Sequence, residues 1–152
     1  MEKCEKTAAL YVASLKAMSL IHQHNHWTTH GLTFYGDHLL FERLYKSTLE
    51  NLDTAAEKFI GLFGSSYLDY DLQTDLLHKV LLKYKDLEGS PAQLSLAVEK
   101  DFLKFSKDAY NCFEEEDRLT LGLDDMLMSI ASDRETSCYL LQQVLNGADS
   151  KD

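Results

Sequence analysis

Helix-breaking residues are scarce in this sequence. Its 152 residues include one proline and seven glycines, while 45% of the residues are hydrophobic. Proline interrupts helices and glycine weakens them, so their scarcity favours long helices. The chain is also long enough to bury a core without disulfides or a structural metal. We therefore expect one domain, residues 1–152, of the all-α class.

The sequence also lacks an excess of basic residues, paired cysteines and long apolar runs. The formal net charge of −10 argues against a nucleic-acid partner and suits a protein that attracts cations. Cys4, Cys112 and Cys138 are odd in number and widely scattered, which favours free thiols in a reducing compartment. The N-terminal residues do not resemble a signal peptide, and no apolar run is long enough for a membrane span. These features predict a soluble, cytoplasmic protein.

Apolar residues recur with helical spacing in five segments. The expected helices cover about residues 5–30, 33–63, 72–84, 91–116 and 120–146. Gly31 and the Asn146-Gly147 pair are expected to end helices, and Ser90-Pro91 is a typical helix start. The expected buried stripe of the second helix consists of Phe34, Phe41, Tyr45, Leu52, Ala56 and Phe59. Four long helices, with a short helix in the long crossover between the second and third, predict a ferritin-like four-helix bundle.

Candidate metal ligands are concentrated between residues 26 and 57. His38 and Glu42 are four residues apart, as are Asp53 and Glu57, and all four fall within about 100° of one helix face. Glu42 and Asp53 are separated by about 16 Å along the helix. Because metal–ligand distances are about 2 Å, both pairs cannot bind one ion within one straight helix. A second, antiparallel copy across a two-fold axis would bring them together and form two equivalent sites per dimer.

This stretch resembles the Dps family of mini-ferritins. The matching residues keep the family spacing of HW, glycine, FxxxH, a carboxylate four residues on, and DxxAE; they are His26, Trp27, Gly31, Phe34, His38, Glu42, Asp53, Ala56 and Glu57. The last predicted helix also resembles the last helix of the family, but more weakly. Three residues depart from the pattern: Glu42 stands where aspartate is common, Thr28 where asparagine is common, and Lys58 where arginine is usual.

The resemblance implies a ferroxidase that stores iron and protects against oxidative damage. Fe(II) would be oxidised to Fe(III), with hydrogen peroxide as the favoured oxidant, and mineralised inside a hollow dodecamer of tetrahedral symmetry. His26, His38 and Glu42 of one subunit would act as metal ligands and catalytic residues together with Asp53 and Glu57 of another. A site inside one bundle is not expected, because the sequence contains no Glu-x-x-His motif.

The candidate residues also have ordinary interpretations. If they bind no metal, His26 would be a hydrogen-bonded core histidine, and Glu42 and Glu57 would be solvated helix residues. Trp27 is expected to pack beside the site. The acidic run 114–117 is either a solvated helix end or, at a three-fold axis, the lining of a pore for cations.

The remaining histidines are weaker candidates. His22 and His30 lie four residues before and after His26 and would extend a metal stripe, but neither matches a family ligand. His24 lies about 160° away from His22 around the helix. His78 is weaker still.

Two alternative functions use the same fold. In the first alternative the protein is a DNA-coating nucleoid protein. In the second it is a metal-binding shell protein without catalytic turnover. DNA coating in the family typically relies on a lysine-rich tail, whereas the termini here carry only Lys3, Lys6 and Lys151 among acidic residues. We therefore expect weak DNA binding or none.

Overall fold

The chain folds into four long helices and one short crossover helix. The computed structural model describes residues 1–149, and side chains within residues 1–147. The elements are α1 (Lys3–Thr28), α2 (Phe34–Phe63), the 3-10 turn η1 (Ser66–Leu68), α3 (Tyr70–Leu82), α4 (Pro91–Glu115) and α5 (Leu121–Asp149). The predicted ferritin-like four-helix bundle, with a short helix between its second and third long helices, is confirmed. No helix in residues 1–149 combines the length and apolar character needed to cross a membrane.

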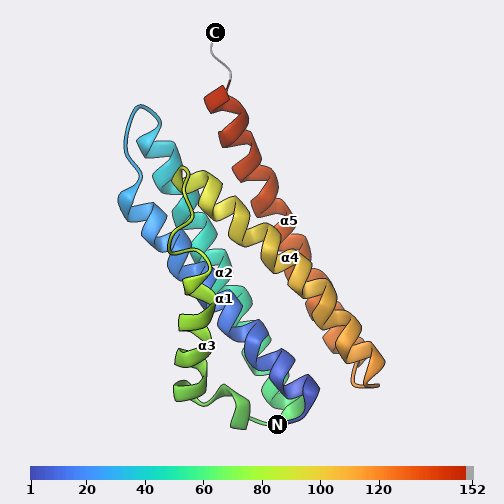
Figure 1. Ribbon diagram of the computed structural model, residues 1–152. Coiled ribbons are helices and arrows are strands. Elements are labelled where there is room, and N and C mark those ends of the chain that lie inside the picture. The colour runs from blue at the N-terminus through green and yellow to red at the C-terminus, as the bar shows by residue number, and fades with distance from the viewer. Residues whose placement is uncertain (150–152) are drawn as a thin grey trace.

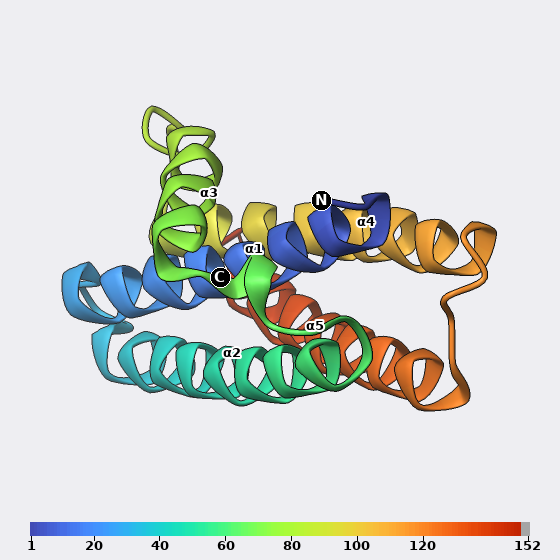
Figure 2. The same cartoon turned by 90° about the horizontal axis from the view of Figure 1, so that it is seen from below.

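The bundle consists of two helical hairpins. α1 and α2 form one hairpin, α4 and α5 form the other, and the crossover through α3 joins them (Figure 1). Seen from below, α3 lies on the side formed by α1 and α4, while α2 and α5 form the opposite side (Figure 2). The outer face of α2 is therefore not covered by the crossover.

Three helix ends differ from the sequence prediction, and one of them is that of α3, which ends at Leu82, two residues before the predicted residue 84. α1 ends at Thr28, because Thr29 is extended, and Gly31 adopts a left-handed conformation (φ 104°) in the loop that follows. The last helix runs to Asp149 instead of ending at Asn146-Gly147. Gly147 stays helical. A glycine ends a helix when it adopts a left-handed conformation, not by its presence alone.

Side-chain caps set the starts of the next helices. α3 begins at Tyr70, two residues earlier than predicted, because the Asp69 carboxylate accepts a hydrogen bond from the Leu72 amide. α4 begins at Pro91, as the Ser90-Pro91 pair predicted. Ser90 Oγ accepts from the Gln93 amide at 3.2 Å, and the Gln93 side chain accepts from the Ser90 amide at 2.8 Å. This reciprocal pair satisfies two amides that have no partner within the helix.

The buried face of α2 is rotated from the predicted stripe. Its buried residues are Phe41, Leu44, Thr48, Asn51, Ala55 and Phe59, so only Phe41 and Phe59 of the predicted six are buried. Two polar residues occupy the centre of this face. Thr48 accepts a hydrogen bond from Arg134, and Asn51 donates to Asp133 at 2.9 Å. An apolar pattern missed them because their burial depends on partners in α5.

The three cysteines are free thiols, in agreement with their odd number and wide spacing. Burial raises the pKa of Cys4 and of Cys138 to about 11. The thiolate, which is the reactive form, is therefore disfavoured at both positions.

Candidate metal site on α1 and α2

His26 and His38 form a reciprocal pair across the α1–α2 hairpin. The Nδ1 atom of His26 lies 2.7 Å from the backbone oxygen of His38, and Nδ1 of His38 lies 2.8 Å from the backbone oxygen of His26. The two imidazoles stack with their centroids 3.8 Å apart. Each ring is therefore positioned by the backbone of the other helix.

These hydrogen bonds determine which ring nitrogen can bind a metal. A carbonyl oxygen only accepts, so Nδ1 of each ring carries the proton and donates it. Nε2 of each neutral imidazole then keeps a free lone pair. Metal-binding histidines are commonly held in this way, with the second ring nitrogen donating to a backbone carbonyl.

Aromatic side chains frame the pair. Phe34 stacks on His38 with a centroid distance of 5.0 Å, and Tyr45 and His26 form a T-shaped pair with a centroid distance of 5.4 Å. Trp27, by contrast, is 67% exposed, so the expectation that it packs beside the site is wrong within the single chain.

Glu42 lies one helical turn beyond His38. It is partly exposed, and its Oε1 accepts a hydrogen bond of 2.6 Å from Lys46 Nζ. The Lys46 hydrogen bond and charge hold the pKa of Glu42 below its usual range. Glu42 is thus ionised at neutral pH and already paired with a cation.

Asp53 and Glu57 are exposed further along α2, and their side chains make no hydrogen bond or ion pair with any residue that the structure describes. Within the part of the chain that the structure describes, no three His, Cys, Asp or Glu side chains are grouped so as to hold a metal ion. One subunit therefore does not bring the five candidate ligands together, and a site shared by two subunits stays a prediction.

The other histidines lie outside this pair. His22 is fully buried and contacts Ser95 and Glu99, so it is a core residue and not part of a metal stripe. His24, His30 and His78 are exposed. The Nδ1 atom of His30 lies 3.2 Å from the backbone oxygen of Thr28.

A buried charged network was missed by the sequence analysis. His22 Nε2 lies 2.9 Å from Glu99 Oε1, and Arg134 Nη1 lies 3.6 Å from the same oxygen; all three side chains are fully buried. Asn25 donates to Ser95 Oγ at 2.7 Å, and this hydroxyl lies 2.9 Å from His22 Nδ1. The network connects the four long helices. Its partners lie on different helices, so no local motif revealed it.

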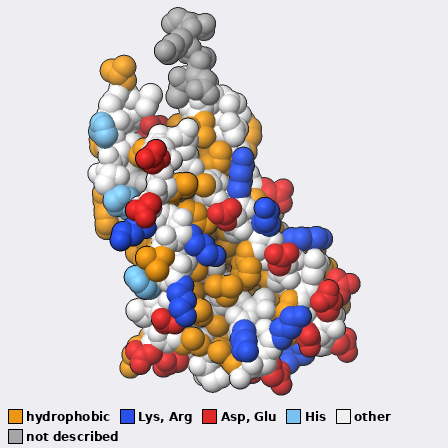
Figure 3. Space-filling view, viewed as in Figure 1, with side chains coloured by type: hydrophobic (Ala, Val, Ile, Leu, Met, Phe, Trp, Pro, Cys, Tyr) orange, Lys and Arg blue, Asp and Glu red, His pale blue; other side chains and the backbone are white. Residues whose placement is uncertain are grey.

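The acidic run 114–117 lies at the junction of α4 and α5. All four side chains are exposed, and Glu116 pairs with Lys3 at 3.9 Å. Acidic side chains also mark this corner of the surface (Figure 3). Within one chain the run is a solvated helix end, and a pore at a three-fold axis stays a prediction.

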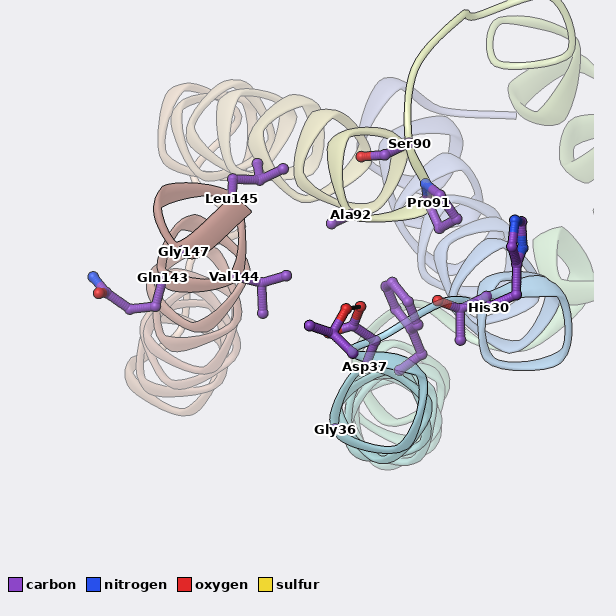
Figure 4. Close-up of a pocket in the computed structure, with 13 residues that line it drawn as sticks. His30, Gly36, Asp37, Ser90, Pro91, Ala92, Gln143, Val144, Leu145 and Gly147 are labelled. Carbon is purple, nitrogen blue, oxygen red and sulfur yellow. Dashed lines mark hydrogen bonds between the residues drawn. The ribbon is translucent and has the colours of Figure 1, made fainter. Parts of the chain in front are cut away.

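A pocket of about 790 Å³ opens at the other end of the bundle, between the ends of α2, α4 and α5. Asp37 and Val144 point into it, whereas His30 lies at its edge (Figure 4). Its lining contains none of the five candidate ligands, so the pocket is separate from the candidate metal site.

Comparisons with known proteins identify the fold. No protein-family model matches the sequence, and no curated protein matches it. The structure is similar to that of Dps from Thermosynechococcus elongatus, with a TM-score of 0.76 and 20% identity over 99% of this chain and 92% of that chain. It is also similar to DpsC from Streptomyces coelicolor, with a TM-score of 0.69 and 21% identity over 93% of this chain and 83% of that chain. The chain therefore has a Dps-like fold along nearly its whole length.

Proposed function

We propose that the protein is a Dps-type ferroxidase that oxidises Fe(II) and stores the Fe(III) product. The observation that carries this proposal is the reciprocal His26–His38 pair, in which Nδ1 of each ring is bonded to a backbone oxygen and Nε2 is left available, with Glu42 one helical turn beyond His38. Imidazole and carboxylate donors with open positions suit a redox iron site. Iron is here the substrate, and the shell would be a homo-dodecamer.

The positions of the candidate ligands along the exposed face of α2 support a site shared by two subunits. Glu42 and Asp53 lie at equal distances in sequence from the peptide between Ser47 and Thr48, and so do His38 and Glu57. An antiparallel copy of α2 centred on that peptide would place Glu42 against Asp53 and His38 against Glu57, twice. His26, His38 and Glu42 of one subunit would then share an iron ion with the partner's Asp53 and Glu57.

Apolar side chains on the same face support a protein contact there. Tyr35, Leu39, Leu49 and Ile60 are 72%, 43%, 45% and 45% exposed. Tyr35 and Ile60 lie symmetrically about the same peptide and would meet in the antiparallel arrangement. Burying these side chains would favour association, and bringing the carboxylates together would require a bound cation or another positive charge.

The proposed reaction balances with one peroxide per pair of sites. Each of two Fe(II) ions gives one electron to a hydrogen peroxide molecule, which takes up two protons and leaves as two water molecules. Asp53 and Glu57 bring negative charge that favours Fe(III) over Fe(II). The ferric product would then hydrolyse and grow as mineral inside the shell.

Iron loading of metal-free protein tests this function. Fe(II) is added without oxygen, oxidation is started with hydrogen peroxide or with O₂ in parallel, and ferric absorbance and particle sedimentation are followed. We expect faster oxidation with peroxide and a soluble, iron-loaded shell. Oxidation no faster than in protein-free buffer, with ferric precipitate, would contradict the proposal.

Glu57→Gln should slow the initial oxidation by at least about tenfold, equivalent to about 1.4 kcal/mol. The substitution nearly preserves shape but removes one charge and one strong donor. Glu42→Asp should have a milder effect, because it restores the residue common in the Dps family. Stopped-flow absorbance measures both rates.

Glu50→Gln is the matched control, since Glu50 is an exposed carboxylate on α2 outside the proposed ligand set. Each variant is first checked for assembly by size-exclusion chromatography. Should Glu57→Gln oxidise Fe(II) at the wild-type rate while Glu42→Asp abolishes activity, the role assigned to Glu57 is wrong.

Binding to DNA should be weak. The net charge of −10 per chain repels phosphates, and of the terminal lysines Lys3 pairs with Glu116 while Lys151 lies outside the described residues. A gel-shift titration with duplex DNA at about 150 mM salt, without Mg²⁺, measures this. A submicromolar dissociation constant would favour the DNA-coating alternative.

A further inference from the structure

Lys46 forms an ion pair with Glu42, one of the proposed iron ligands. Its ammonium group donates to Glu42 Oε1 at 2.6 Å from the next helical turn. Among the ion pairs of the described residues, this is the one that includes a proposed ligand. Lys58, which adjoins Glu57 in sequence, points elsewhere, since its ammonium lies 3.4 Å from where a Cβ on Gly122 would stand.

Lys46 also lies near the centre of the proposed two-fold contact. The antiparallel arrangement pairs it with Leu49 of the second copy, one turn inward from the pairing of Glu42 with Asp53. Without metal, the carboxylates of Glu42, Asp53 and Glu57 would repel one another across the contact, more strongly as water leaves it. A lysine at this position supplies positive charge to offset that repulsion.

We propose that Lys46 competes with the metal ion for Glu42. The Lys46 ammonium group stays paired with the Glu42 carboxylate until a divalent metal displaces it. This inference rests on the proposed function, because it assigns Glu42 to the iron site. Two consequences follow. The lysine lowers the affinity of the site for divalent metals, and it allows the subunits to associate before iron is bound.

Cobalt(II) binding tests the first consequence. Co(II) is stable to air as a probe, and its binding is followed by calorimetry and visible absorbance. At a protein concentration and ionic strength at which both proteins are assembled, Lys46→Gln should bind Co(II) about three- to fivefold more tightly than wild type, the factor expected from loss of an exposed ion pair. Lys46→Arg keeps the charge and should bind within twofold of wild type.

Lys79→Gln is the matched control. Lys79 forms an exposed ion pair with Asp75 at 2.9 Å, also four residues apart, but on α3 away from the site. Its loss should leave Co(II) affinity unchanged. Equal or weaker binding by Lys46→Gln than by wild type would overturn the inference while leaving the proposed function intact.

Assembly without metal tests the second consequence. At low ionic strength, metal-free Lys46→Gln should contain less oligomer than wild type by analytical ultracentrifugation, and Zn(II) should restore it. Loss of assembly both with and without Zn(II) would overturn the inference, because Lys46 would then be needed for the contact itself. If wild-type protein binds no Co(II), the proposed function fails, and the inference fails with it.

Discussion

Joint refolding of two strongly impaired variants should restore about a quarter of the wild-type Fe(II) oxidation. One variant carries His26→Ala and His38→Ala, and the other carries Asp53→Asn and Glu57→Gln. Each variant alone lacks two proposed ligands in every site. Because each lost ligand is expected to slow oxidation at least about tenfold, each variant should be at least about a hundredfold slower than wild type.

The recovery follows from the shared site. In a mixed pair, the site built from the two substituted halves has none of these four ligands, whereas the other site has all of them. Random pairing makes about half of the pairs mixed, and half of the sites in a mixed pair are intact. About a quarter of all sites would then be active.

The experiment needs subunits that exchange. The variants are unfolded and refolded together, and a sample refolded separately and then mixed is the control, with assembly checked by size-exclusion chromatography. Recovery only after joint refolding would demonstrate a site between subunits. A jointly refolded sample no faster than either variant, although it assembles normally, would place the functional ligands within one chain or elsewhere.

Arg134→Met should lower the free energy of unfolding by about 3–5 kcal/mol, because removing one member of a buried charged group leaves the other uncompensated. Arg134 is fully buried and donates to Thr48, to Ser47 at 2.8 Å and to Ser137 at 3.1 Å, besides its contact with Glu99. The substitution would leave the Glu99 carboxylate without its arginine. A loss of this size is a large share of typical protein stability.

Urea unfolding at one fixed subunit concentration measures the change, since stability of an oligomer depends on concentration. Replacing Arg134 and Glu99 together with apolar residues should recover part of the loss, because the Glu99 carboxylate is no longer buried without its arginine, while His22 loses its Glu99 partner. Lys79→Met, which breaks an exposed ion pair, should cost less than about 1 kcal/mol. An Arg134→Met variant as stable as this control would show that the buried network contributes little.

The sequence by itself determined the helix count, the crossover and which candidate ligands share one face of α2. Each of these depends on local spacing: apolar residues repeat with the helical period, and residues four apart share a helix face. The start of α4 followed from Ser90 and Pro91 for the same reason, since a cap and its target amide lie within one turn. The ligand roles of His26, His38, Glu42, Asp53 and Glu57 stay predictions from that spacing.

Only the tertiary structure decided which residues are buried against which, and which ring nitrogens are free. Thr48 and Asn51 occupy the buried face of α2 because Arg134 and Asp133 reach them from α5, which turns the helix away from its predicted stripe. The imidazoles of His26 and His38 each donate to the backbone oxygen of the other residue, because the α1–α2 turn brings their helices together. The burial of a polar side chain and the tautomer of a histidine both depend on partners that are distant in sequence. A periodic pattern of apolar residues contains no information about those partners.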